Sequence, residues 1–284
     1  MKTHRIIAAI LLVCVPAVYA ASPPRRSLGE NAALRYWAAF SQMQDSTLSD
    51  EEAKQLNGIL TGPVPYSDLK YKDLIEKNRP ALETLARGTT FADCDWGLDY
   101  SMGPDTPVEY VRKALELGRL NVLYVFHLEI NGDKDGAVRA LTAGVRFSHD
   151  VANGGSLFAT LVAKDLLTTH FRAIGFVEHM AGLTTPEREK LRQAIAGLGP
   201  SGLDWQAAMR RELAALNQPE WEIALRSINQ NYIAALTDKS ALPSVQASIA
   251  KAPERLQRAV PNPARVLGEQ EDFAKQLQQI RSAL

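Results

Sequence analysis

The chain has 284 residues, with 32 basic and 32 acidic side chains, so its formal net charge is zero. Hydrophobic residues make up 46% and charged residues 23% of the chain. That composition is typical of a globular protein and excludes a disordered, a collagen-like or a membrane-embedded chain. The balanced charge also gives no electrostatic reason to expect a nucleic acid as the partner.

The first 20 residues have the pattern of a secretory signal. Lys2 and Arg5 precede an apolar run of about ten residues, 6–15, which is too short to span a membrane. Val18 and Ala20 then place small residues three and one positions before a cleavage site. The sequence therefore predicts cleavage after Ala20 and a secreted or periplasmic protein. An uncleaved anchor would need a longer apolar run.

Cleavage after Ala20 changes the cysteine count. Cys14 lies inside the signal and follows Val13, whereas a lipid-attachment site needs a small residue at that place. Cys94 is then alone in the mature chain and cannot form an internal disulfide. No later apolar run is free of charge, because the stretch 157–177 carries polar residues. We therefore expect no integral membrane insertion after signal cleavage.

Helix-start signals recur along the rest of the chain. Residues 21–30 have no helical pattern and are expected to form a flexible mature N-terminus before a single α-helical domain, 31–284. A looser C-terminal part from about residue 243 stays open. Within the domain Asn31 and the capping box Ser49–Glu52 begin the first two helices. A third begins at Ser67 and is expected to be interrupted before Pro80, because proline disfavours helical geometry in the preceding residue.

The next three helices are the longest expected in the chain. Thr106, Pro107 and Glu109 predict a cap, a first-turn proline and a capping box for a helix that stops at Asn131–Gly132. Two more helices follow at about 133–152 and 156–180. Further starts are expected at Thr185, Asp204, Pro219, Ser244 and Asn262.

Alternation with a period of two is almost absent, and only residues 88–103 suggest extended chain. The sequence predicts an all-α protein of about ten helices in stacked antiparallel hairpins. The strict 34-residue tetratricopeptide pattern is absent, so an irregular solenoid and a helical bundle both stay open. Trp37, Trp205 and Trp221 lie on amphipathic stretches and are expected in the core.

Three short segments resemble a loose group of secreted bacterial helical-hairpin (tetratricopeptide-like) proteins with no assigned activity. The segments are Asn31–Trp37 near the mature N-terminus, Cys94–Asp99 ahead of a long helix pair, and Pro261–Pro263 before the last helix. The resemblance extends over most of the mature chain. It implies an extracytoplasmic α-helical fold, and it implies no reaction and no catalytic residue.

One acidic segment is a candidate metal site. Asp93, Asp95 and Asp99 lie close together in sequence, and carboxylate oxygens bind hard cations such as Ca²⁺. The spacing lacks the later bidentate glutamate of a helix-loop-helix calcium site. The favoured alternative is that Trp96 fills a hydrophobic groove while the aspartates bond loop backbone. Cys94 would act as a nucleophile only with a base brought near it by the fold.

A second candidate combines histidine and aspartate on two neighbouring helices. His149 and Asp150 lie on one predicted helix, and Asp165 and His170 lie on the next. If these side chains converge, they suit metal binding or proton transfer. His149 lies on the same face as the apolar stripe, so a hydrogen-bonded interhelical residue is the favoured alternative.

Motifs of known chemistry are missing from the sequence. It has no phosphate-binding glycine loop, no Gly-x-Ser-x-Gly elbow, and no zinc or haem motif, so we expect no cofactor. The first hypothesis is a helical scaffold outside the cytoplasm that binds a protein or peptide partner without catalysis. The alternative is a metal-dependent or acid/base enzyme built on the Asp/His cluster. A structural envelope component that pairs with itself is a third possibility.

Overall fold

The structure is a computed structural model that describes residues 30–45, 48–62, 64–106, 108–216 and 218–284. The predicted signal, residues 1–20, and residues 21–29 of the expected N-terminal segment lie outside the described residues. Over the described part of the chain the fold is all-α, as predicted. Its backbone pairing outside helices includes an isolated parallel bridge between Asn31 and Asp93.

Most of the α-helices are joined by short connections, and three of the connections contain 3₁₀ helix. In chain order they are α1 (Ala32–Gln42), α2 (Asp50–Thr61), α3 (Asp68–Gly88), α4 (Glu109–Ile130), α5 (Lys134–Ala152), α6 (Leu157–Ala181), α7 (Thr185–Ala196), α8 (Trp205–Ala215), α9 (Glu222–Thr237), α10 (Leu242–Ala250), α11 (Glu254–Ala259) and α12 (Pro263–Ala283). The 3₁₀ turns are η2 (Tyr100–Asp105), η3 (Pro219–Trp221) and η4 (Lys239–Ala241). None of the helices in the described residues is both long enough and apolar enough to cross a membrane.

Helices α4, α5 and α6 form the centre of the molecule, and α5 packs against both of the others. The predicted turn between α4 and α5 is confirmed. Gly132 adopts a φ of 82°, and the Asp133 carboxylate accepts a hydrogen bond from the Gly136 amide at 2.8 Å. Gly118 allows α4 and α6 to approach closely, because a Cβ atom there would lie 2.4 Å from Leu166 Cδ2.

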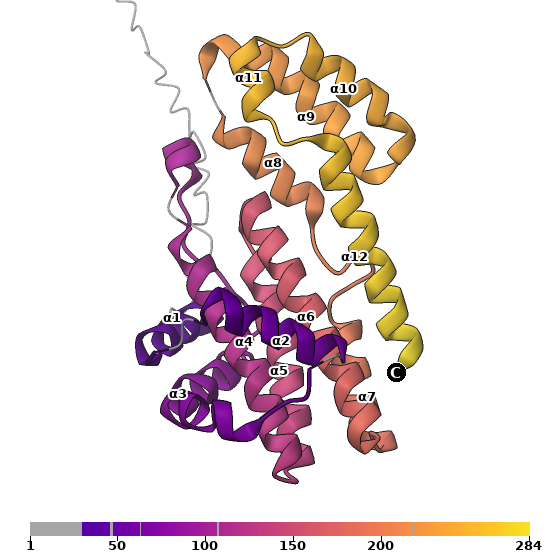
Figure 1. Ribbon diagram of the computed structural model, residues 1–284. Helices are drawn as coiled ribbons and strands as arrows, with labels where there is room; N and C mark the ends of the chain where they lie inside the picture. The colour runs from indigo at the N-terminus through magenta and orange to yellow at the C-terminus, as the bar shows by residue number, and fades with distance from the viewer. Residues whose placement is uncertain (1–29, 46–47, 63, 107, 217) are drawn as a thin grey trace, which may run out of the picture.

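The remaining helices cover this centre in two groups. Helix α1 packs against α3, α3 packs against α4, and α2 lies across α6. Helices α8–α11 form a second group, from which α12 runs back along α6 and α7 (Figure 1). As a result α2, α6 and α12, which are far apart in sequence, lie next to one another.

The predicted interruption of α3 is wrong. The helix runs without a break from Asp68 to Gly88, with Pro80 in its interior. Pro80 is exposed, and the helix buries Ile75, Leu82 and Leu85 on its other side. Burial of apolar side chains before and after the proline outweighs the single backbone hydrogen bond that proline cannot donate.

The predicted start of α4 is also wrong. The helix begins at Glu109, and its N-cap, Val108, has no side-chain hydrogen bond to the helix. Thr106 is engaged elsewhere, since its hydroxyl donates to the carbonyls of Asp99 and Gly103 at 3.1 and 2.8 Å. The preference of Thr106 for an N-cap position is overridden by its hydrogen bonds to the preceding loop. Pro107 lies outside the described residues.

The prediction for the tryptophans holds for Trp205, which is buried, and fails for Trp37, which is 42% exposed. Helix α1 buries Tyr36 and Phe40 instead. Those two side chains are four residues apart and share one helix face, so Trp37 is rotated toward the edge of that face.

Candidate functional site

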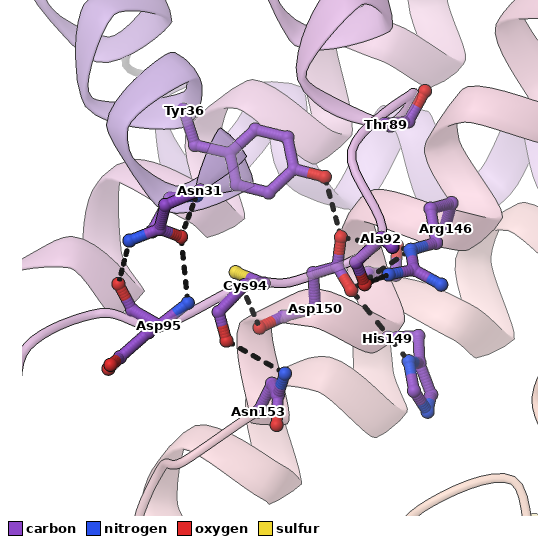
Figure 2. Close-up of polar contacts among 12 residues, drawn as sticks. Asn31, Tyr36, Thr89, Ala92, Cys94, Asp95, Arg146, His149, Asp150 and Asn153 are labelled. Atoms are coloured by element: carbon purple, nitrogen blue, oxygen red, sulfur yellow. Dashed lines mark hydrogen bonds and ion pairs between the residues drawn. The ribbon is translucent and has the colours of Figure 1, made fainter. Parts of the chain in front are cut away.

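The acidic segment 93–99 is fastened to the start of α1. Asn31 donates from Nδ2 to the carbonyl of Asp95 at 2.7 Å, and its Oδ1 accepts from the Asp95 amide at 2.8 Å. The Ala32 amide donates to the carbonyl of Asp93 at 2.8 Å. Figure 2 shows Asn31 making both bonds to Asp95. These bonds therefore fix the backbone of this loop to the start of α1.

The side chains of Asp93, Asp95 and Asp99 are exposed, whereas Trp96 between them is buried. The Asp95 carboxylate accepts from the Gly97 amide at 3.0 Å, and the Trp96 indole donates to the carbonyl of Asp150 at 2.8 Å. Trp96 is thus buried, as the alternative to a metal site at this segment predicted. Among the described residues, no group of three or more His, Cys, Asp and Glu side chains is placed to hold a metal ion.

Asp150 of α5 is buried and bonds to Tyr36 of α1. Its Oδ2 accepts a hydrogen bond from the Tyr36 hydroxyl at 2.7 Å, and Arg146 Nε lies 3.1 Å from both carboxylate oxygens. His149 Nδ1 lies 3.9 Å from Oδ1 (Figure 2). Burial raises the pKa of Tyr36 far above its ordinary value, and the neighbouring Asp150 raises it further. Tyr36 is therefore a permanent donor to this carboxylate.

Cys94 is packed under the same contact and is not an activated thiol. Its Sγ lies 3.8 Å from the carbonyl of Asp150, and Asn153 donates to the carbonyl of Cys94 at 2.8 Å. Burial raises the pKa of the Cys94 thiol far above its ordinary value, with Asp150 adding to the effect. Because only the thiolate is strongly nucleophilic, Cys94 serves packing at neutral pH.

His170 lies fully buried between α4, α5 and α6. Its Nδ1 is 2.8 Å from the carbonyl of Leu166 and 3.1 Å from Ser148 Oγ, and Asn121 Nδ2 approaches its Nε2 at 3.2 Å. A neutral ring that donates from Nδ1 and accepts at Nε2 satisfies this set. Burial lowers the pKa of His170 to about 4. The ring therefore joins three helices as an uncharged group.

The four residues of the predicted Asp/His cluster thus lie in three places. His149 and Asp150 lie side by side near α1, and the hydrogen bonds of His170 go to Leu166, Ser148 and Asn121. Asp165 lines a surface cleft on α6.

That cleft has a volume of about 350 Å³ and lies where α2, α4, α6 and α12 meet. Its walls carry three cationic side chains, Arg119, Lys164 and Arg172, and one acidic side chain, Asp165. The hydroxyls of Thr168 and Thr169 and the amides of Asn57 and Gln276 line it as well, with apolar residues of α2 at one side, Ala53, Leu56 and Leu60.

Each cation of the cleft has a different bonding state. Lys164 forms an ion pair with Glu269 of α12, and Arg172 Nη1 donates to Asn57 Oδ1 of α2 at 3.0 Å. Arg119 makes no hydrogen bond or ion pair with the described residues. The Asp165 residue is exposed. Partial desolvation of its carboxylate nevertheless raises its pKa, and this effect outweighs the lowering by the three cations. With Glu269 included, three cations face two carboxylates.

A second hollow of about 330 Å³ adjoins the first, because both are lined by Thr168, Arg172 and Gln276. Its other lining residues include the apolar Phe171, Ile280 and Ala283. We call the two adjoining hollows together the α6–α12 cleft. One end of it is polar and cationic, and the other end is largely apolar.

Sequence reasoning missed Arg119 and Arg172 as site residues. One signal was present, since Lys164, Thr168 and Arg172 recur every four residues and place a polar row along an otherwise apolar helix. Arg119 had no comparable signal. The partners that α2 and α12 supply to α6 are set by the tertiary fold, since Asn57 lies 115 positions from Arg172 and Gln276 lies 108 positions from Thr168.

The chain was compared with known proteins. It matches no protein-family model, no curated protein and no solved structure.

Proposed function

We propose that this chain is an extracytoplasmic protein that binds a protein or peptide partner in the α6–α12 cleft and carries out no catalysis. The observation that carries the proposal is the cleft itself. Four helices from separate parts of the chain build it, and it presents hydrogen-bonding side chains beside apolar ones. Binding sites combine apolar walls with a few well-placed polar groups in this way.

The placement of the chemically reactive residues supports the same proposal. Cys94 is a buried protonated thiol, His170 is an uncharged interhelical ring, and Asp150 is committed to Tyr36 and Arg146. Packing and hydrogen bonding explain why each of these groups lies where it does. A substrate would have to displace one of those contacts before any of the three took part in chemistry.

A bulky side chain at the wall of the cleft is expected to block binding. Thr169 is half-buried in the cleft wall, so Thr169→Trp fills the space that a peptide would occupy. We expect the purified protein to retain members of a random decapeptide pool, and the variant to retain them at least about tenfold more weakly. Fluorescence anisotropy of the dye-labelled pool measures both affinities.

Thr142→Trp is the matched control. Thr142 is also a half-buried helical threonine whose hydroxyl donates to the carbonyl four residues earlier, and it lies outside the cleft. It should bind the pool as the wild type does. If the wild type retains no peptide, or if both variants lose binding equally while circular dichroism shows that they are folded, the proposal is wrong.

The export part of the proposal rests on residues 1–20 of the sequence. We expect the protein expressed with its own N-terminus in a bacterium to accumulate in the periplasmic fraction with Ala21 as its first residue. N-terminal sequencing of that fraction is the measurement. Cytoplasmic protein that still begins at Met1 would contradict export, and Arg5→Glu, which removes a positive charge before the apolar run, should reduce processing.

A further inference from the structure

The two ends of the α6–α12 cleft differ in chemistry, and this difference restricts what the cleft accepts. At one end Arg119 makes no hydrogen bond with the described residues, and Arg172, which lines both hollows, donates to the neutral Asn57 side chain. At the other end Phe171 and Ile280 are almost fully buried and form the floor of the second hollow. A ligand that fills the whole cleft needs an anionic group near the arginines and an apolar group near that floor.

The charge balance of the cleft favours one negative charge. The Lys164–Glu269 pair neutralises itself, and Asp165 offsets one of the two arginines. Among the described residues one positive charge is then left without a counterpart, and Arg119 and Arg172 share it, since both act on Asp165. Guanidinium groups bind carboxylates through charge-assisted hydrogen bonds that are often bidentate, so a single carboxylate suits this place.

The side chains where the two hollows meet can bond the peptide group next to a C-terminal residue. The hydroxyl of Thr168 donates to Gln276 Oε1 at 2.6 Å, which leaves the Gln276 Nε2 group able to donate to a ligand. Gln279 lies farther along the same face of α12 and offers a second amide. Amide side chains both donate and accept, as the N–H and C=O groups of a peptide require, whereas a plain aliphatic acid has no polar groups along its chain to pair with them.

We infer that the α6–α12 cleft captures the C-terminus of a peptide chain, with its carboxylate at Arg119 and Arg172 and an apolar last side chain against Phe171 and Ile280. This inference rests on the proposed function and specifies its ligand. Recognition of a C-terminal carboxylate is a recurrent mode of peptide binding, in which the charge gives orientation and a pocket for the last side chain gives selectivity.

The test compares dye-labelled random hexapeptide pools that end in leucine, as the free acid and as the C-terminal amide, by fluorescence anisotropy. The free-acid pool should bind wild-type protein at least about tenfold more tightly than the amide pool. Arg119→Gln should weaken the acid pool by at least about tenfold and leave the amide pool unchanged. Arg139→Gln is the matched control, an exposed arginine on α5 outside the cleft, and should change neither affinity.

Two further probes define the ligand. A free-acid pool that ends in glycine should bind several-fold more weakly than the leucine pool, because it leaves the apolar floor uncovered. N-acetyl-leucine, a small carboxylic acid with the same last residue, should compete only at far higher concentration than the leucine pool. Equal affinity for the leucine and glycine pools, or equally strong competition by N-acetyl-leucine, overturns the inference.

The outcomes separate this inference from the proposed function. If acid and amide pools bind equally and Thr169→Trp abolishes both, the cleft binds peptides but does not read the C-terminus, so only the inference fails. If neither pool binds, both fail. An unchanged affinity of the acid pool for folded Arg119→Gln also overturns the inference, because the carboxylate then has another anchor.

Discussion

Replacement of Asp150 by alanine is expected to lower the free energy of unfolding by about 3 kcal/mol. The substitution removes the acceptor of the Tyr36 hydroxyl, which is fully buried, and leaves that hydroxyl without a partner. It also removes the carboxylate that Arg146 Nε approaches at 3.1 Å. Urea unfolding followed by circular dichroism at pH 7 measures the change.

Two variants check that this loss comes from the buried contact. Tyr36→Phe removes only the hydroxyl and should cost about 1 to 2 kcal/mol. Asp135→Ala removes an acidic residue of the same helix whose side chain is 68% exposed and pairs with exposed Lys190, so it should change stability by less than about 1 kcal/mol. If Asp150→Ala is as mild as Asp135→Ala, Asp150 does not hold α1 to α5 as described.

Mild acid is expected to destabilise the protein through His170. Burial lowers the pKa of this side chain from 6.5 to about 4 in the folded protein. Between these two values the unfolded chain binds a proton that the folded protein does not, so stability falls as the pH falls from 6.5 to 4. The contribution is fully present above pH 6.5. It should amount to about 2.5 kcal/mol between pH 7.5 and pH 4.5.

The contribution of His170 is isolated by comparing variants. His170→Gln should make the free energy of unfolding fall less between pH 7.5 and pH 4.5, by about that amount, whatever its stability at pH 7.5. The wild-type protein, measured at the same two pH values, is the reference. The histidine proton resonances give a direct check in the unaltered protein. A His170 resonance that titrates near pH 6.5 would contradict the lowered pKa.

Local signals in the sequence were sufficient for most helix starts. The capping box at Ser49 and Glu52 forms as predicted, with the Glu52 carboxylate accepting from the Ser49 amide at 2.8 Å. Asn262 caps α12 by accepting from the Arg265 amide at 3.1 Å. These interactions join residues three apart, so their geometry follows from the helix itself and needs no knowledge of the rest of the fold.

Predictions failed where distant packing competes with local preference. Pro80 stays inside α3 because the helix buries apolar side chains before and after it, and Thr106 bonds the loop 99–103 instead of capping α4. Propensities of this kind amount to only about 1 to 3 kcal/mol, so tertiary contacts override them. The sequence pattern shows the preference but not the strength of the competing contact.

The same limit of local sequence signals applies to the candidate site. The residue types of Asp150, Asp165 and His170 were visible in the sequence, but their partners were not. Asp150 meets Tyr36, which lies 114 positions away, and Asp165 shares a cleft with Arg119 of α4 and Gln276 of α12. Helical periodicity tells which residues share a face of one helix, and it carries no information about which other helix covers that face.

The all-α class, most helix boundaries and the charge and cysteine content therefore follow from the amino-acid sequence, because these depend on composition and on contacts within one or two helical turns. The packing of the helices places α2, α6 and α12 around a cleft in which Arg119 makes no hydrogen bond with the described residues, and it encloses His170 while Asp165 faces water. The physical reason is that burial and charge pairing arise between segments far apart in the chain, where each side chain's surroundings are set by the packing of whole helices.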